Sequence, residues 1–453
     1  MLRLAAEHLV STALYKTVKA SRLTLALVLY IAVPGPARAE GDAPIRQQVS
    51  ETTAAAILIE AGRLEDAKLV LAHVLQTTPN DNEAIFLVGM IAVAEKRYDA
   101  AINEFRNILA VEPNRERVRL ELARAFFIAG DYDNAERNFK FARAGDLPPE
   151  TKTTIDQYLA AITRLRRWSY NVGFSLADDT NVNGATSVRT VDLSGLPFTL
   201  SDNARQKSGA GIALDLGGEW SPLLWESTKA RLGTAIHRLE YGGHSFDDMT
   251  VSLYAGPEFL FSRWQIDTLA TSFRRWYGGE PYNEGIGGRG IVSYIVTPAL
   301  QLATALDLQT VSYRVATFQN GSVISANTQL SYTISPSSTV RFSGGIASQE
   351  AKLAAFTDNT YWLALDYYRD LPWGFSGNFQ PAYSWTHYDA ALAAFGVVRA
   401  DRTLALRFDV LNRRIEYGGF APRLSYIYVS QQSSIALYRF SRNQVQLGLT
   451  RQF

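Results

Sequence analysis

The spacing of apolar and polar residues divides the chain into three segments. A largely apolar run covers residues 23–33, residues 50–167 repeat their apolar positions every three or four residues, and from Trp168 onward apolar and polar residues alternate. A period of 3.6 is typical of a helix with one buried face, whereas a period of two is typical of a strand with two different faces. The pattern therefore predicts a leader, a helical domain and a β domain, in that order.

The leader has the three parts of a secretory signal peptide. A basic segment ending at Arg22 precedes the apolar run, and Ala37-Arg38-Ala39 supplies the small residues of a cleavage site. The apolar run is much shorter than the roughly 20 residues that a membrane-spanning helix needs. We therefore expect residues 1–39 to be removed and the exported chain to begin at Glu40.

Residues 40–167 are expected to form a periplasmic domain of tetratricopeptide repeats. Shifting the sequence by about 34 residues, the period of these repeats, brings like residues into register through three cycles. A small residue in each cycle lets two helices approach closely, and a larger residue four positions later fills the same face. The predicted repeat core is Ala67, Ala101, Ala135, Leu71, Phe105 and Phe139, and a further column holds Gly62, Lys96 and Gly130. A last helix near residues 149–167 should cap this solenoid, whose concave face suits a partner's peptide or helix.

Residues 168–453 are expected to form a transmembrane antiparallel β-barrel. The segment contains about fourteen alternating stretches of roughly 10–14 residues, the length that a tilted strand needs to cross a bilayer, and their number is even. A soluble sandwich would use strands of about five or six residues. The predicted fold class is therefore α+β, with an N-terminal tetratricopeptide-repeat α-solenoid followed by a barrel of about 14 strands.

Aromatic residues and the chain end also favour a barrel in the outer membrane, surrounded by its lipid. Every tryptophan lies at or after Trp168, and the expected topology places them in two girdles, one toward the periplasmic rim and one toward the outer rim. The outer group comprises Trp276, Trp362 and Trp385. The last strand alternates and ends at Phe453, which is the kind of signal that the barrel assembly machinery reads.

Composition and motifs give no reason to expect catalysis, a cofactor or a metal. The chain has no cysteine, which excludes thiolate chemistry, and its net charge of +1 gives no reason to expect nucleic acid as a partner. Gly285, Gly287 and Gly290 fit a dinucleotide fingerprint, but they lead into a strand and not into a helix. The histidines lack metal-ligand spacing, and Asp247-Asp248 is expected to be a solvated pair in an outer loop. We expect a protein that is not an enzyme.

One polar stretch is a candidate site. The long first outer loop, about residues 178–205, begins with Asp178, Asp179, Asn181 and Asn183. Asx side chains often cap their own turns, which would make this an ordinary loop. If the first strand continues past Ala177, alternate residues would instead share one face, where they could hold a loop or meet an extended cargo in the lumen.

This order of features resembles the surface lipoprotein assembly modulator (Slam) family, the outer-membrane component of type XI secretion. The resemblance rests on the repeats, the Trp168-Ser169-Tyr170 opening of the barrel and the Asp178–Asn183 stretch, in which Asp and Thr replace the family's Pro and Ser. It implies an outer-membrane translocator whose partners are an exported cargo, either a surface lipoprotein or a soluble effector, and a periplasmic chaperone. A polysaccharide exporter and a porin-like channel with a periplasmic repeat domain are the alternatives.

Overall fold

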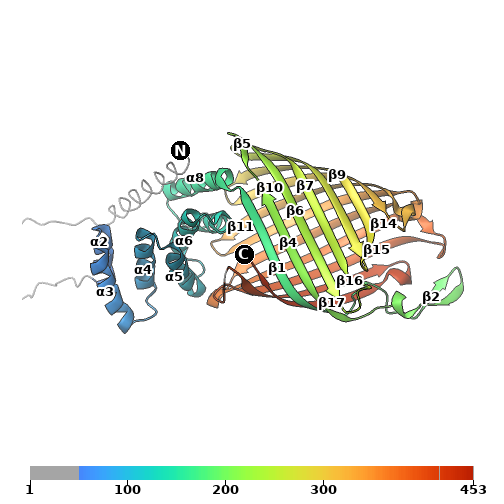
Figure 1. Ribbon diagram of the computed structural model, residues 1–453, viewed down its shortest axis with the longest axis horizontal. Coiled ribbons are helices and arrows are strands. Elements are labelled where there is room, and N and C mark those ends of the chain that lie inside the picture. Colours follow the sequence, from blue (N-terminus) through green and yellow to red (C-terminus); the bar gives the residue numbers. More distant parts are fainter. Residues whose placement is uncertain (1–49, 418, 452–453) are drawn as a thin grey trace, which may run out of the picture. The chain divides into compact units, whose positions relative to one another are not determined.

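The computed structural model describes residues 50–417 and 419–451, and the expected leader (residues 1–39) and Phe453 lie outside this range. Helices come first along the chain and strands follow (Figure 1). The helices are α2 (Glu51–Glu60), α3 (Leu64–Thr77), α4 (Asn82–Ala94), α5 (Tyr98–Val111), α6 (Glu116–Ala129), α7 (Tyr132–Arg143) and α8 (Pro149–Leu165). Among the described residues, none of these helices is both long enough and apolar enough to span a membrane.

The strands close into an antiparallel barrel. Its members are β1 (Trp168–Asp179), β4 (Gly209–Trp220), β6 (Thr228–Tyr241), β7 (Asp248–Leu260), β8 (Trp264–Tyr277), β9 (Glu280–Thr297), β10 (Leu300–Tyr313), β11 (Gly321–Ser335), β12 (Ser338–Ala351), β13 (Asp358–Asp370), β14 (Phe375–Leu392), β15 (Val397–Asn412), β16 (Ala421–Ser433) and β17 (Phe440–Thr450). Each pairs with its neighbour in the chain, and β1 pairs with β17 to close the ring. Within the described residues the ring has fourteen strands, which confirms the predicted fold class.

Three short strands lie outside the ring. β2 (Thr190–Leu193) and β3 (Leu196–Thr199) form a hairpin in the first outer loop, and β5 (Leu223–Trp225) pairs with the start of β6. The long loop expected over residues 178–205 therefore contains a hairpin. Its two turn residues, Ser194 and Gly195, both have positive φ, as a two-residue type I′ turn requires.

Alternation along the strands separates a lipid face from a lumen face. On β1 the exposed Phe174 and Leu176 alternate with the buried Ser175 and Ala177. Trp362 departs from the expected outer girdle, because on β13 it alternates with the exposed Tyr361 and Leu363. Its indole lies beside Gly345, where an added Cβ would come within 2.8 Å of the ring nitrogen, so it points into the lumen.

The chain consists of two compact units, and the boundary between them lies within α5, between Phe105 and Arg106. The sequence places a domain boundary near residue 167, whereas this division assigns the last helices to the barrel's unit. In the first unit Ala67, Leu71, Ala101 and Phe105 are fully buried. The ring of Phe105 packs on Gly89 of α4, where any Cβ would lie 2.5 Å from it, so a larger residue at position 89 would collide with the ring.

The column Gly62, Lys96 and Gly130 has a shared backbone role. All three residues have positive φ, at 74°, 61° and 83°. They follow a helix in a left-handed conformation, which glycine adopts without the steric conflict that a Cβ causes. Lys96 is therefore a non-glycine residue in a position that favours glycine.

The second unit contains the last three helices together with the barrel. Ala135 and Phe139 of α7 are fully buried, and Phe139 stacks on Tyr158 of α8 at 4.8 Å between ring centroids. Glu136 of α7 accepts from Arg166, just beyond α8, at 2.7 Å. Burial opposes ionisation of Glu136, but Lys140 and Arg166 outweigh it and lower the pKa of Glu136 to about 2. The two helices are thus joined by an apolar core and an ion pair.

Candidate functional site

The first candidate site lies where the two ends of the barrel sheet meet, which we call the seam. β1 and β17 pair in register from Gly173 opposite Thr450 to Asp179 opposite Gln444. In every other neighbouring pair of the ring, one strand follows the other along the chain. β1 and β17 are instead the first and the last strand of the ring. The seam is therefore held by non-covalent contacts, with no connecting turn between its strands.

A buried polar group lies at the far end of the seam from the helices. This seam cluster consists of Asp179, Tyr241, Arg442 and Gln444, and Asp179 is only 1% exposed. One carboxylate oxygen of Asp179 accepts from Arg442 at 2.5 Å, from the Tyr241 hydroxyl at 2.8 Å and from Gln444 at 3.0 Å. Because Arg442 and Gln444 belong to β17, the Asp179 side chain of β1 links the two strands of the seam.

The two asparagines of the motif fix the loop that follows β1. Asn181 is fully buried and donates to the backbone oxygens of Ala185, at 2.9 Å, and Ser441, at 3.0 Å. Asn183 donates to the Arg205 oxygen at 2.8 Å and accepts from the Lys207 amide at 3.1 Å. Asn181 thus ties the loop to β17, and Asn183 ties its two ends together.

The expected common face of this motif does not form as a whole. β1 ends at Asp179, and the chain bends at Thr180, so Asn181 and Asn183 lie in the loop and not on the strand. Asp178 is exposed on the face that carries Phe174 and Leu176, away from the lumen. Of the candidates Asp178, Asp179, Asn181 and Asn183, only Asp179 is on the lumen side of the strand.

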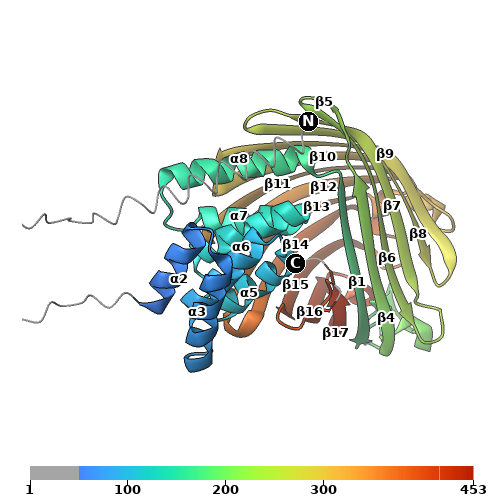
Figure 2. The same ribbon diagram turned by 60° about the vertical axis from the view of Figure 1, so that its left-hand side comes forward.

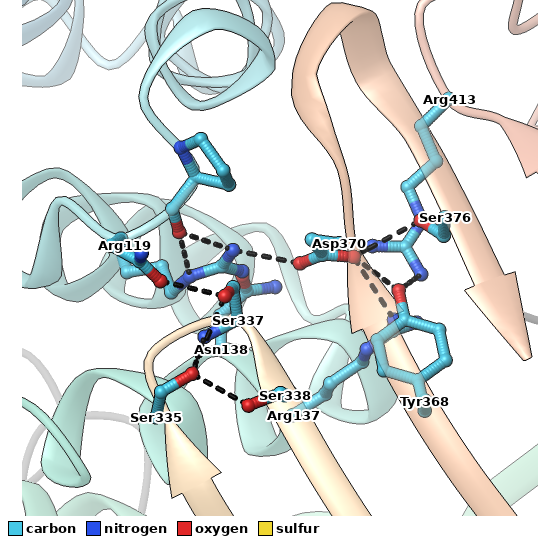
Figure 3. Close-up of polar contacts among 12 residues, drawn as sticks. Arg119, Arg137, Asn138, Ser335, Ser337, Ser338, Tyr368, Asp370, Ser376 and Arg413 are labelled. Carbon is cyan, nitrogen blue, oxygen red and sulfur yellow. Dashed lines mark hydrogen bonds and ion pairs between the residues drawn. The ribbon is translucent and has the colours of Figure 1, made fainter.

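A second polar group lies at the helix-side mouth of the barrel. This mouth cluster comprises Arg119, Arg137, Tyr368, Asp370 and Arg413, and Figure 3 shows the side chains converging on Asp370. Arg119 of α6 reaches the Asp370 carboxylate at 2.7 Å, and Arg413 reaches it at 3.2 Å. Tyr368 also donates to Asp370. A buried carboxylate on the barrel rim therefore receives donors from both the helices and the barrel.

Arg137 of α7 completes the mouth cluster. Its guanidinium lies over the Tyr368 ring, 4.6 Å from the centroid, and 3.9 Å from Asp370. Loss of contact with water, together with the neighbouring Arg413, lowers the pKa of Arg137 to about 10, so it is still charged at neutral pH. Three guanidinium groups thus face a single carboxylate.

The opposite side of the mouth is held by Lys229 of β6. This lysine is 3% exposed and donates to the backbone oxygens of Thr163, at 2.9 Å, and Arg166, at 2.8 Å. Both oxygens belong to the C-terminal end of α8, where carbonyl groups lack partners within the helix and attract a cation. A barrel lysine therefore caps the last helix.

Sequence reasoning did not identify the mouth cluster or Lys229. Arg119 and Asp370 are 251 positions apart, and no local pattern links them. One signal was available: Arg119 lies on the same helical face as Leu122 and Phe126, and a charge on an apolar face indicates a buried partner.

The lumen wall is lined with paired charges. Arg231 binds Glu219 at 2.6 Å and Asp267 at 3.0 Å, and Arg289 binds Asp307 at 2.5 Å. Arg407 and Asp409 form a further pair at 2.8 Å. The wall is therefore polar but carries no strong excess of either sign.

The end of β6 and the loop that follows it bring three possible cation ligands together. Oxygen and nitrogen atoms of Glu240, His244 and Asp247 lie within 4.8 Å of one another. Both oxygens of Asp247 already accept hydrogen bonds, from the Tyr241 amide at 2.8 Å and from His244 at 3.0 Å, so we assign no ion here. Asp247-Asp248 also differs from the expected solvated pair, because Asp248 binds Arg275 at 2.5 Å.

Two models of known protein families match this chain, one over the barrel and one over part of the helices. A family model described as surface lipoprotein assembly modifier matches residues 168–453. A tetratricopeptide repeat model matches residues 92–140.

Individual proteins match over most of the chain. A surface lipoprotein assembly modifier of Moraxella catarrhalis is 23% identical over 393 residues, covering 84% of this chain and 76% of the relative. A surface lipoprotein assembly modifier 1 of Neisseria meningitidis serogroup B is 24% identical over 407 residues, covering 87% and 81%. Among solved structures, the outer membrane channel DcaP of Acinetobacter baumannii superposes with a TM-score of 0.37 at 7% identity, covering 63% of this chain and 97% of the channel.

Proposed function

Because this chain belongs to the surface lipoprotein assembly modifier family, we propose that it delivers surface lipoproteins, or related soluble effector proteins, across the outer membrane. The barrel spans that membrane, and the helices face the periplasm, where an exported cargo arrives. The protein acts without catalysis, by binding cargo and providing its route. Its partners are the cargo, a periplasmic chaperone, the barrel assembly machinery and the surrounding lipid.

The observation that carries this proposal is the seam. A barrel of fourteen strands encloses a lumen too narrow for most folded domains, because diameter grows with strand number. Cargo therefore crosses unfolded, or passes with the help of an opened seam. β1 and β17 can separate without breaking a covalent connection between them, once their backbone ladder and the contacts of Asp179 with Arg442 and Gln444 are released.

The lumen wall favours a polypeptide over a polysaccharide as the cargo. An exporter of a charged polysaccharide would favour a lumen with a strong excess of one sign, whereas here Arg289, Arg407 and Arg231 are each matched by carboxylates. Paired charges offer both donors and acceptors, which an unfolded polypeptide backbone needs in a confined passage. The repeats then hold the cargo or its chaperone before entry.

The test is a disulfide across the seam. Ala177 and Gln446 are register partners on β1 and β17, and the chain has no native cysteine. In cells that co-express a lipoprotein cargo, we expect oxidised Ala177→Cys/Gln446→Cys to lower surface exposure of the cargo at least tenfold, and a reductant to restore it. Surface exposure is measured by antibody binding to intact cells.

A matched disulfide elsewhere in the ring controls for stiffening of the barrel. Ala382 and Ala405 are register partners on β14 and β15, so Ala382→Cys/Ala405→Cys should leave delivery unchanged. Full delivery by the oxidised seam variant would exclude seam opening and assign the route to the lumen alone. If cells with and without the wild-type protein expose equal amounts of cargo, the proposed function is wrong.

A further inference from the structure

Helices α6, α7 and α8 lie at the helix-side opening of the barrel, with which they form one compact unit (Figure 2). They are attached to the rim on two sides, and the two attachments differ in kind. One side is continuous with the barrel backbone, and the other consists of contacts between side chains.

The continuous side joins α8 to β1. Only Arg166 and Arg167 separate the two elements, and the Ser221 amide donates to the Arg167 oxygen at 2.7 Å, which extends the ladder between β1 and β4. Lys229 binds the same end of α8. A short link of this kind allows rotation but not separation.

The other side is held by side-chain contacts, which include the stacked rings of Phe141 and Tyr368. Arg119 binds Asp370 at 2.7 Å, and Asn114, in the turn before α6, accepts from Ser337 in the β11–β12 turn at 2.6 Å (Figure 3). A cavity of about 60 Å³ lies beside these contacts, between Leu122 and Phe126 of α6 and Phe375 of the barrel rim. The packing on this side therefore leaves an empty space beside the polar contacts.

Each partner of the Arg119–Asp370 pair has other bonds to keep when the pair separates. On the barrel, Asp370 retains Arg413 at 3.2 Å and Ser376 at 3.0 Å. On the helices, Arg119 retains the Pro113 oxygen at 2.8 Å and Asn138 at 3.3 Å. When this contact breaks, Asp370 keeps a counter-charge in Arg413, and Arg119 keeps two neutral oxygen acceptors while its guanidinium becomes accessible to water. Hydrogen-bond partners therefore remain for both groups in the open arrangement, as a two-state element requires.

We infer that α6, α7 and α8 form a gate over the periplasmic mouth of the barrel, with its hinge at Arg166–Arg167 and its latch at Asp370 and Ser337. The closed gate covers the entrance, and release of the latch lets the helices swing aside while α8 stays attached to β1. This inference rests on the proposed function, because an incoming cargo has to pass this mouth.

The experiment locks the latch in the full-length protein. Asn114 and Ser337 are in side-chain contact, so Asn114→Cys/Ser337→Cys is the crosslink to make in a chain without other cysteines, and loss of free thiols on oxidation verifies that the disulfide has formed. We expect the oxidised variant to expose at least tenfold less cargo on the cell surface, and the reduced variant to recover wild-type exposure. Equal exposure in both redox states would overturn the gate.

A second disulfide at the same turn provides the control. Ser335 and Ser338 are register partners within the β11–β12 hairpin, so Ser335→Cys/Ser338→Cys crosslinks the rim to itself and leaves the helices free. We expect this variant to deliver cargo equally in both redox states. Loss of delivery upon its oxidation would mean that stiffening of the rim, and not closure of the gate, blocks delivery.

Single-channel conductance tests the gate without cargo. We expect Asn114→Cys/Ser337→Cys in planar bilayers to show at least a twofold rise in the time spent open when reductant is added. No change on reduction would overturn the gate. A rise in open time, combined with no cargo delivery by the wild-type protein, would uphold the gate and contradict the proposed function.

Discussion

Asp178 and Asp179 are neighbours in sequence with opposite environments. Asp178 is exposed on the outer face of β1, whereas Asp179 is buried in the seam cluster and binds Arg442 at 2.5 Å. We expect Asp179→Asn to destabilise the barrel by about 2–4 kcal/mol, because the substitution leaves the Arg442 charge without a carboxylate. The temperature at which the folded form disappears on a gel without prior boiling measures this loss.

The neighbouring residue supplies the control for this prediction. Asp178→Asn should change barrel stability by no more than about 0.5 kcal/mol, as is usual for exposed positions. Equal shifts for the two variants would show that the seam cluster does not stabilise the barrel.

At the residue scale, the sequence marked candidate residues but not the residues that they bind. The run of Asx residues after the first strand marked Asp179, Asn181 and Asn183 as candidates. Their binding partners include Tyr241, Ser441 and Arg442, which are at least 60 positions away, and only closure of the barrel brings them near. The bend at Thr180 also was not predicted, since strand alternation carries no information about where a strand stops.

At the element scale, the repeat column at Gly62, Lys96 and Gly130 gives a stability prediction. Lys96 adopts φ = 61°, where a Cβ costs roughly 1–2 kcal/mol relative to the right-handed region. Lys96→Gly removes that strain but adds freedom to the unfolded chain, so we expect a net gain of about 0.5–1 kcal/mol. The urea midpoint of the helical signal in circular dichroism measures it.

The opposite substitution in the same column is the matched test. Gly62 has φ = 74° with open space around it, so Gly62→Ala introduces backbone strain without a steric clash and should lower the urea midpoint. A fall in the midpoint for Lys96→Gly would mean that the positive φ at Lys96 is not strained.

The helices and strands were predicted better than the side-chain contacts, because the sequence patterns that indicate helices and strands are local. Alternation is clear along strands such as β1 and β13, and Pro222, Pro298, Pro336 and Pro372 lie at the turns on the helix side. The β2–β3 hairpin was missed because only four residues lie in each strand, too few for alternation to be recognised. The Ser194-Gly195 pair was the available signal for its turn.

At the scale of the whole molecule, the sequence places the domain boundary at residue 167, where the period changes. The structure joins the last helices to the barrel through Arg119, Asp370 and Lys229, whose contacts cross that boundary. A change in local period reports a change in secondary structure, and it carries no information about which elements pack together. Residues 168–453 alone are therefore expected to assemble as a barrel of reduced stability.

The substitution Lys229→Met tests whether the helices stabilise the barrel. In the full chain the Lys229 ammonium group donates to the Thr163 and Arg166 oxygens at 2.9 and 2.8 Å, so Lys229→Met should destabilise the protein by about 1.5–3 kcal/mol. In residues 168–453 both acceptors are absent and water reaches the ammonium group. There we expect the same substitution to change the unfolding temperature of the barrel by less than half as much. Equal effects of Lys229→Met in the two chains would mean that capping α8 adds nothing to the stability of the barrel, and that the hinge side of the mouth is held by the chain connection alone.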